Sequence, residues 1–291
     1  MKVLVTGANG QLGHDVVDEL RKRGHEAITT DISGDMDYLL DITKDDVVNF
    51  VKNIAPDAII HCAAWTAVDA AEDAENRDKV YAINVTGTEN LVKAADYLEC
   101  KFLYLSTDYV FDGEGEKPWK PDDKSYAPLC YYGETKLKGE FAVSSLEKYF
   151  IVRIAWVFGL HGNNFIKTMI NVGKTHSEVR VVNDQVGTPT YTYDLARLLA
   201  DMIETEKYGY YHATNEGGYI SWYDFCEEIY KQVKLDTKIV PVTTLEYGLS
   251  KAKRPFNSRL DKSKLSDNGF ERLPEWKDAL RRYLIELGYG E

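Results

Sequence analysis

The first half of the chain alternates short apolar runs with longer stretches of helical periodicity. This order predicts strands at 2–6, 26–30, 58–62, 102–106 and 150–157, and helices at 11–23, 43–54, 77–97 and 132–144. Helical connections of ten residues or more make consecutive strands run parallel and cross over with a right-handed turn. The sequence therefore predicts an α/β fold, a Rossmann-type doubly wound parallel sheet.

After Gly159 the pattern loosens and becomes richer in helix. It predicts helices at 164–172, 192–205, 221–234 and 275–287, and short strands at 179–182, 210–212 and 238–240. Ser221 and Asp224 have the spacing of a helix-capping pair. We expect 1–160 to be a dinucleotide-binding Rossmann domain. We expect 161–291 to be mainly a smaller mixed substrate lobe, with segments returning to the first domain. Ligands of open α/β sheets bind at the carboxyl ends of the strands, where such a lobe would lie.

Charge and cysteine usage exclude several classes of protein. The chain of 291 residues carries 35 Lys and Arg against 47 Asp and Glu, a net charge of -12, which argues against a nucleic-acid partner. Cys62, Cys100, Cys130 and Cys226 lack the paired spacing of a zinc or redox site. The start of the chain has no signal-peptide core, and no apolar run reaches 18 residues. We expect a soluble cytoplasmic protein with reduced thiols, no bound metal and no membrane contact.

A glycine-rich turn follows the first predicted strand and opens the first helix. Its residues Gly7, Gly10 and Gly13 have the spacing Gly-x-x-Gly-x-x-Gly. Glycines allow a tight turn and a close approach to a pyrophosphate, which the N–H groups and dipole of the helix start would bind. A tight connection without a ligand would use glycines too. The strand before the turn and the helix after it favour a dinucleotide site.

Five more positions fit a dinucleotide, three of them its adenosine half. Asp31 ends the second strand and could accept hydrogen bonds from both ribose hydroxyls, which favours NADH over NADPH. Asp41 and Ile42 follow where an adenine ring could lie. Ala63 and Ala64 leave room for a coenzyme, although core packing explains these alanines equally well.

Tyr132 and Lys136 are one helical turn apart, so the phenol and the ammonium share a helix face. We expect the ammonium to lower the pKa of the phenol towards the range of a general acid. A chain with 20 tyrosines contains such a pair by chance. Ser106 and Thr107, at the end of the strand before this helix, supply the hydroxyl that would bind a substrate carbonyl.

Together these motifs resemble the extended short-chain dehydrogenase/reductase superfamily and, within it, the dTDP-4-dehydrorhamnose reductase family. The segments that carry the closer resemblance are 63–69 (AAWTAVD), 105–113 (LSTDYVFDG), 128–140 (PLCYYGETKLKGE), 184–190 (DQVGTPT) and 254–260 (RPFNSRL). The resemblance runs from the first strand to about Leu260. It implies reduction of the 4-keto group of dTDP-4-dehydro-β-L-rhamnose to dTDP-β-L-rhamnose with NADH or NADPH.

The resemblance also implies roles for single residues. Tyr132 would donate the proton, Lys136 would hold the nicotinamide ribose, and Thr107 would orient the keto oxygen. The coenzyme set is Gly7, Gly10, Gln11, Leu12, Gly13, Asp31, Asp41, Ile42, Ala63, Ala64, Trp65, Tyr132 and Lys136. The substrate set is Thr107, Asp108, Trp156, Arg254 and Arg259, with the two arginines as our hypothesis for the diphosphate of the dTDP-sugar. Trp65 stands where many relatives have His, so a backbone or stacking contact is expected there.

Two other functions stay open at this stage. The chain could be a partner-binding regulatory subunit of the methionine adenosyltransferase type, which resembles the same reductases. It could also be a nucleotide-sugar epimerase, which shares the three catalytic residue types. We expect either a monomer or a homodimer.

Overall fold

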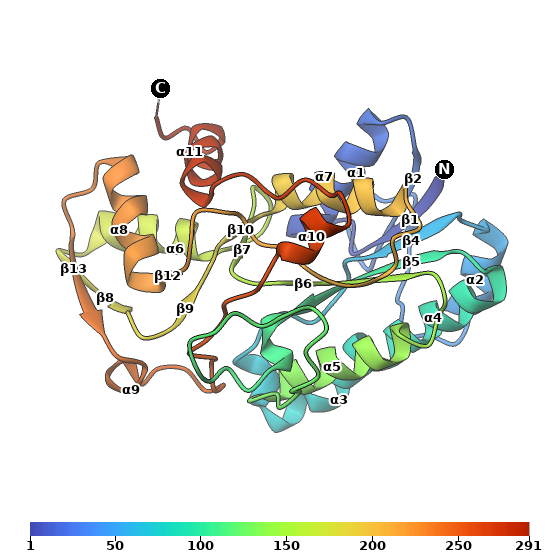
Figure 1. Ribbon diagram of the computed structural model, residues 1–291, viewed down its shortest axis with the longest axis horizontal. Coiled ribbons are helices and arrows are strands. Elements are labelled where there is room, and N and C mark those ends of the chain that lie inside the picture. The colour runs from blue at the N-terminus through green and yellow to red at the C-terminus, as the bar shows by residue number, and fades with distance from the viewer. Residues whose placement is uncertain (291) are drawn as a thin grey trace.

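The computed structural model describes residues 1–290, and its centre is a seven-stranded parallel sheet (Figure 1). The strand order is β11-β6-β5-β4-β1-β2-β3. The strands are β1 (Lys2–Thr6), β2 (Glu26–Asp31), β3 (Tyr38–Leu39), β4 (Ala58–His61), β5 (Lys101–Thr107), β6 (Tyr149–Ile154) and β11 (Gly209–His212). The order reverses at β1, which is flanked by β2 and β4, so the predicted doubly wound sheet is confirmed.

Helices cover both faces of this sheet (Figure 1). One face carries α1 (Gln11–Lys22) and α7 (Thr192–Ile203), and the other carries α2 (Val47–Ile54), α4 (Gly87–Leu98) and α5 (Tyr131–Val143). Successive side chains of β5 alternate between the two cores. Leu103 and Leu105 pack with α1 and α7, while Phe102 and Tyr104 pack with the helices of the opposite face. This alternation explains why the strand is apolar throughout.

A smaller lobe is built on the carboxyl-terminal side of the chain. It contains α6 (Phe165–Thr175), α8 (Trp222–Val233), α11 (Trp276–Glu286), the short α9 (Thr244–Tyr247) and the strand pair β8 (Glu178–Val182) and β13 (Lys238–Val242). Two-residue strands form two more pairs, β7 (Val157–Phe158) with β10 (Thr190–Tyr191), and β9 (Val186–Gly187) with β12 (Ile220–Ser221). The predicted capping pair is confirmed, because Ser221 and Asp224 form a reciprocal capping box at the start of α8.

Parts of the second half of the chain return to the large sheet. Strand β11 forms one edge of the sheet, beside β6. After α10 (Ser263–Asp267), the side chains of Phe270 and Leu273 pack into the same core as α1 and α7. The second half of the chain therefore contributes to the core of the large sheet as well as to the core of the small lobe.

Three of the predicted elements are broken or shortened in the structure, which also contains short elements that were not predicted, namely β3, β9, β10, β12, α9 and α10. The strand predicted at 150–157 ends at Ile154, because Trp156 has a left-handed backbone (φ 52°), and pairing resumes only in β7. The helix predicted at 77–97 contains a π-helical turn at Ala82–Thr86, between α3 (Arg77–Tyr81) and α4. The helix predicted from residue 43 begins at Val47, because the Asp41 carboxylate accepts from both the N–H and the hydroxyl of Thr43. Such a side-chain turn competes with helix formation.

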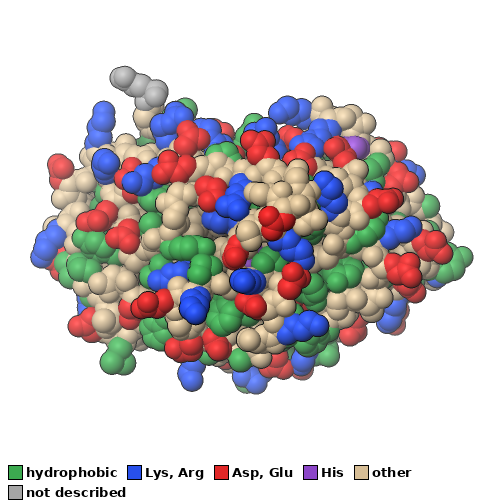
Figure 2. Space-filling model, in the orientation of Figure 1, with side chains coloured by type: hydrophobic (Ala, Val, Ile, Leu, Met, Phe, Trp, Pro, Cys, Tyr) green, Lys and Arg blue, Asp and Glu red, His purple; other side chains and the backbone are tan. Residues whose placement is uncertain are grey.

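Two broader features concern the surface and the helices. Acidic and basic side chains are interspersed over the face drawn in Figure 2. Among residues 1–290, every helix is too short or too polar to cross a lipid bilayer.

Candidate active site

A groove of two adjoining cavities lies at the carboxyl ends of β1, β4, β5 and β6. The inner cavity has a volume of about 420 Å³ and the outer one about 340 Å³. Both are lined by Gly7, Gly10, Cys62 and Ala64, so they meet at the glycine-rich turn. The lining of the groove therefore includes Asp31 in the outer cavity and Tyr132 in the inner one, with the glycine-rich turn common to both.

The glycine-rich turn forms the floor where the cavities meet. Gly7 has a left-handed backbone (φ 69°), and the Gly10 N–H donates to its carbonyl at 3.0 Å. A Cβ atom on Gly13 would lie 2.1 Å from the Gly7 oxygen, so only glycine fits there. Gln11 and Leu12 begin α1 and also line the inner cavity. The turn thus presents the start of a 12-residue helix to the groove, as a pyrophosphate requires.

The residues predicted for the adenosine half of the coenzyme line the outer cavity. It is lined by Asp31, Asp41, Ile42, Ala63, Ala64 and also by Lys79 and Ile83. The Asp31 carboxylate accepts from the Asn9 N–H at 3.1 Å and from the Ile32 N–H at 2.7 Å. Each of these bonds uses one lone pair of an oxygen, so the carboxylate can still accept from ribose hydroxyls.

Trp65 does not line either cavity. Its indole N–H donates to the Ala67 carbonyl at 3.0 Å, and its backbone N–H donates to Asn84 Oδ1 at 2.8 Å. Asn84 lies in the π-helical turn, is buried, and donates from its amide to Thr135 Oγ1 at 3.0 Å. It thereby links the Trp65 loop to the helix of Tyr132 and Lys136. Sequence reasoning missed Asn84, because an isolated asparagine within a helical pattern gives no signal of this role.

Tyr132, Lys136 and Thr107 all line the inner cavity. The first two lie on α5, and Thr107 is the last residue of β5. Burial raises the pKa of the Tyr132 phenol, and the Thr107 side chain opposes this shift by hydrogen bonding. The ammonium of Lys136 is not among the groups that shift this pKa. The expected lowering of the Tyr132 pKa is therefore wrong for the protein without coenzyme, because desolvation outweighs the hydrogen bond with Thr107.

Lys136 is itself buried, with 4% of its surface exposed. Its Nζ lies 4.1 Å from the centre of the Tyr104 ring. Burial lowers the pKa of Lys136 to about 7, and the charge of Glu140 opposes the shift. Glu140 is one turn further along α5 and pairs with Arg153 of β6 at 2.7 Å, both side chains being fully buried. Helix α5 therefore carries a buried ion pair one turn beyond Lys136.

Two neighbours of Thr107 also line the inner cavity, Ser106 and Asp108. Within the described part of the chain, the buried Ser106 Oγ has no hydrogen-bond partner. Asp108 is buried, and desolvation raises its pKa to about 6. A buried hydroxyl without a partner, in the cavity that Lys136 also lines, leaves a polar position free for a ligand such as a coenzyme ribose.

Trp156, between β6 and β7, also lines the inner cavity. Its indole stacks on Trp222 of α8 with ring centres 3.8 Å apart. The left-handed backbone turns this side chain out of the sheet, and the stack fixes it in the cavity wall. Trp156 thus joins the small lobe to the large one at the groove.

Arg254 and Arg259 lie outside the lining of the groove. Arg254 pairs with Asp69 at 2.7 Å and donates to the Tyr109 hydroxyl at 3.3 Å. Arg259 donates to Asn257 Oδ1 at 3.0 Å. Their assignment to a diphosphate stays a prediction, and Arg254 would have to leave Asp69 to fulfil it.

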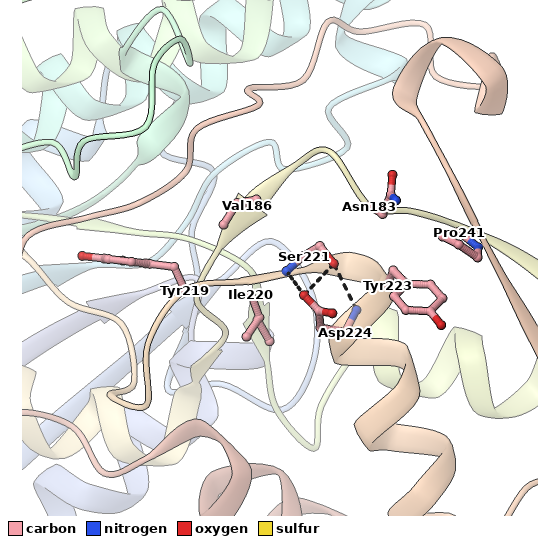
Figure 3. A pocket seen from close by; sticks show the side chains of 8 residues that line it. All are labelled: Asn183, Val186, Tyr219, Ile220, Ser221, Tyr223, Asp224 and Pro241. Atoms are coloured by element: carbon pink, nitrogen blue, oxygen red, sulfur yellow. Dashed lines mark hydrogen bonds between the residues drawn. The ribbon is translucent and has the colours of Figure 1, made fainter.

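A further cavity of about 350 Å³ lies in the small lobe, beside the capping box of α8 (Figure 3). Its wall includes Asn183, Tyr219, Tyr223 and Pro241 (Figure 3). It shares no lining residue with the groove. None of the residues predicted for the active site lines it.

Comparison with known proteins places the chain in a family. The RmlD substrate binding domain family matches residues 1–288. The dTDP-4-dehydrorhamnose reductase of Aggregatibacter actinomycetemcomitans is 39% identical over 295 residues, covering 96% of this chain and 97% of that protein.

Two crystal structures of dTDP-4-dehydrorhamnose reductases are similar over the whole fold. The protein from Clostridium acetobutylicum has a TM-score of 0.92 and 45% identity, with 99% of this chain and 100% of that chain covered. The protein from Bacillus anthracis, in complex with NADP, has a TM-score of 0.91 and 41% identity, with 98% and 100% covered. The chain therefore belongs to the RmlD substrate binding domain family, together with the dTDP-4-dehydrorhamnose reductases that it matches from end to end.

Proposed function

We propose that the protein is an NAD(P)H-dependent reductase that converts the 4-keto group of dTDP-4-dehydro-β-L-rhamnose to the alcohol of dTDP-β-L-rhamnose. One observation carries the proposal. Tyr132, Lys136 and Thr107 line one cavity that opens onto the glycine-rich turn, in a chain of this family. A phenol, an ammonium and a hydroxyl around one cavity can bind and protonate a ketone oxygen.

The groove fits a nicotinamide dinucleotide. The glycine-rich turn would hold the pyrophosphate, the residues around Asp31 and Ile42 would hold the adenosine, and Lys136 would hold the nicotinamide ribose. When bound, the coenzyme supplies the hydride for C4 of the sugar. The carboxylate of Asp31 favours NADH, while the relative from Bacillus anthracis was crystallised with NADP. We therefore propose that the protein accepts either coenzyme.

Tyr132 supplies the proton in this mechanism. Its raised pKa keeps the phenol protonated and ready to donate at neutral pH. As the C4 carbonyl carbon gains a hydride, its oxygen takes the phenolic proton and becomes the hydroxyl group. A charged Lys136 one turn away favours the resulting phenolate, which regains a proton from solvent. Thr107 would donate its hydroxyl hydrogen to the same keto oxygen and so orient it.

The small lobe, 161–291, would bind the rest of the substrate, with Asp108 and Trp156 against the sugar. Since the net charge is -12, the diphosphate needs local donors. We propose that the enzyme is cytoplasmic and acts as a monomer or homodimer.

Replacing Tyr132 with Phe tests the function directly. The protein is purified, and the oxidation of NADH and NADPH is followed with dTDP-4-dehydrorhamnose as substrate. Tyr132→Phe should lower kcat by at least about a hundredfold, because the general acid is lost. Coenzyme affinity, measured by fluorescence titration, should be retained.

Tyr131→Phe is the matched control on the same helix. Its hydroxyl donates to the Arg77 carbonyl at 3.3 Å, and Tyr131 is absent from the lining of the groove. It should keep wild-type turnover. Full activity of Tyr132→Phe, or no reduction of the keto sugar by the wild-type protein, would contradict the proposal.

A further inference from the structure

We propose that Asp69 is a positioning residue for the nucleotide sugar, whose carboxylate holds the Arg254 guanidinium at the edge of the inner cavity and gives it up to the diphosphate of the substrate. The inference rests on the proposed function and adds to it a residue that touches no ligand itself. Asp69 is not among the site residues predicted from the sequence.

Arg254 is bonded to the surroundings of the inner cavity at two points. Its Nη1 donates to the Tyr109 hydroxyl at 3.3 Å, and Tyr109 lines the cavity. Its Nη2 donates to Asp69 Oδ2 at 2.7 Å, and Val68, which precedes Asp69 in the chain, lines the cavity as well. The guanidinium therefore contacts one residue of the cavity wall and the chain neighbour of another, which places it at the edge of the cavity.

A nucleotide sugar needs a positive charge at this edge. Among the described residues that line the two cavities, the basic ones are Lys79 in the outer cavity and Lys136 in the inner one. The nicotinamide ribose would occupy Lys136, and the chain as a whole has a net charge of -12. An arginine suits a diphosphate, because its planar guanidinium donates two parallel hydrogen bonds to phosphate oxygens. Arg254, bonded to Tyr109 of the cavity wall, is placed to supply them.

The two carboxylate oxygens of Asp69 have separate tasks. Oδ1 accepts from the backbone N–H groups of Lys251 at 3.1 Å and Ala252 at 3.0 Å, and so holds the backbone that leads to Arg254. Oδ2 accepts from the guanidinium of Arg254. The Lys251 side chain ties the same segment down a second time, because its Nζ pairs with Asp73 at 2.8 Å. The backbone can therefore stay in place while the guanidinium changes partner.

This exchange of partners costs little free energy. The Arg254 side chain is 29% exposed and the Asp69 side chain 42% exposed, and ion pairs in contact with water contribute little to stability. After the exchange Asp69 keeps its two backbone N–H partners, so its charge is not left without hydrogen bonds. The Tyr109 hydroxyl still holds the guanidinium near the cavity. Asp69 thus keeps Arg254 in place for the substrate and lowers the affinity only by the small amount that the ion pair contributes.

The first measurement is the binding of dTDP to the full chain, by titration calorimetry without coenzyme. Asp69→Asn keeps an oxygen for the two backbone N–H groups but loses the charge that pairs with Arg254. It should lower the Kd for dTDP about two- to fivefold, because Arg254 no longer has to leave a partner. Arg254→Met should raise this Kd at least about tenfold. In the Arg254→Met background Asp69→Asn should have no further effect, because Asp69 acts through Arg254.

Asp73→Asn is the matched control. It removes a carboxylate that pairs with the same segment, at Lys251, and its side chain is 36% exposed. Arg254 and its partner Asp69 are untouched by this change. Asp73→Asn should therefore leave the Kd for dTDP unchanged, which separates the release of Arg254 from a general loss of negative charge.

The second measurement uses the wild-type chain and so does not depend on the folding of Asp69→Asn. The chain is labelled with ¹⁵N at arginine, and the Nε signal of Arg254 is assigned by its loss in Arg254→Met. Saturating dTDP should move this signal, because the guanidinium changes partner. The signal of Arg282, which pairs with Asp194 at 2.7 Å, should stay where it is.

The third measurement is the steady-state reduction of dTDP-4-dehydrorhamnose. Asp69→Asn should lower the KM for the keto sugar about two- to fivefold and should not raise kcat, because substrate and transition state carry the same diphosphate. A residue that only supported the fold would instead give a higher KM or a lower kcat when replaced.

Three results would overturn the inference. They are an unchanged or higher Kd for dTDP in Asp69→Asn, an equal gain in affinity from Asp73→Asn or in the Arg254→Met background, and an Arg254 signal that dTDP does not move. If the wild-type protein does not reduce the keto sugar, the proposed function fails, while the binding of dTDP still decides whether Asp69 holds Arg254 for a diphosphate.

Discussion

Replacing Lys136 with Met should stabilise the coenzyme-free protein while abolishing reduction. The side chain is 4% exposed and lies over the Tyr104 ring, and burial lowers its pKa from 10.5 to about 7. A charged amine in such a place destabilises the fold, and the proposed reaction gives a reason for keeping it. Methionine has a similar length and carries no charge.

The magnitude follows from the pKa values of the folded and unfolded states. Each tenfold change in proton affinity is worth about 1.4 kcal/mol. At pH 6.5 the wild-type protein therefore loses roughly 4–5 kcal/mol of unfolding free energy, as an upper bound, by burying this amine. Between pH 7 and pH 10.5 the unfolded chain binds more protons than the folded one, so the stability of the wild type rises with pH. At pH 9.5 the loss falls to roughly 1–2 kcal/mol.

The assay is urea unfolding of both proteins without coenzyme at pH 6.5 and pH 9.5. The advantage of Lys136→Met should shrink by roughly 3 kcal/mol between the two values. Lys138→Met is the control on the same helix, because the Lys138 side chain is half-exposed and pairs with Glu134 at 2.8 Å. It should change stability by at most about 1 kcal/mol at either pH. An equal advantage of Lys136→Met at both pH values would refute the reasoning, since it would mean that Lys136 keeps an ordinary pKa.

Two further substitutions test the scaffold of the site. Arg153→Met leaves Glu140 buried without its partner and should lower the free energy of unfolding, measured by urea titration, by about 3–5 kcal/mol. The double variant Arg153→Met, Glu140→Met removes both charges and should recover most of that loss. Gly13→Ala places a Cβ atom 2.1 Å from the Gly7 oxygen, which would distort the turn. Coenzyme affinity, measured by fluorescence titration, should therefore fall at least about tenfold. An unchanged affinity would show that the turn does not hold the pyrophosphate.

Most of the large sheet could be predicted because its strands and helices repeat a simple pattern. Each buried parallel strand is a continuous apolar run, and each helix has its own period of 3.6 residues. The small lobe was predicted less completely. Its two-residue strands β7, β9, β10 and β12 are too short to show any period.

The break at Trp156 and the π-helical turn at Asn84 had no signal in the sequence. A tryptophan is a poor choice for a left-handed backbone, so the apolar run through Val157 indicated a continuous strand. The π-helical turn adds one residue to a helical pattern that still looks regular. Both irregularities lie beside the groove, where local sequence preferences give way to the geometry of a ligand site.

The members of the site were easier to predict than their electrostatics. Spacing alone put Tyr132 and Lys136 on one face of α5, and the ends of parallel strands brought Thr107 to the same edge of the sheet. Spacing contains no information on burial, however, and burial decides the pKa values of both side chains. The sequence also could not show that Arg254 pairs with Asp69, because the two residues are far apart in the chain.

The left-handed conformation of Trp156 has a consequence for any attempt to improve this protein. A bulky residue with φ 52° costs of order 1–2 kcal/mol, which glycine would not incur. The fold could regain that free energy only by giving up the indole that lies against Trp222 and faces the groove. Screening variants for heat resistance alone would therefore tend to remove the aromatic wall of the binding site, so binding has to be selected at the same time.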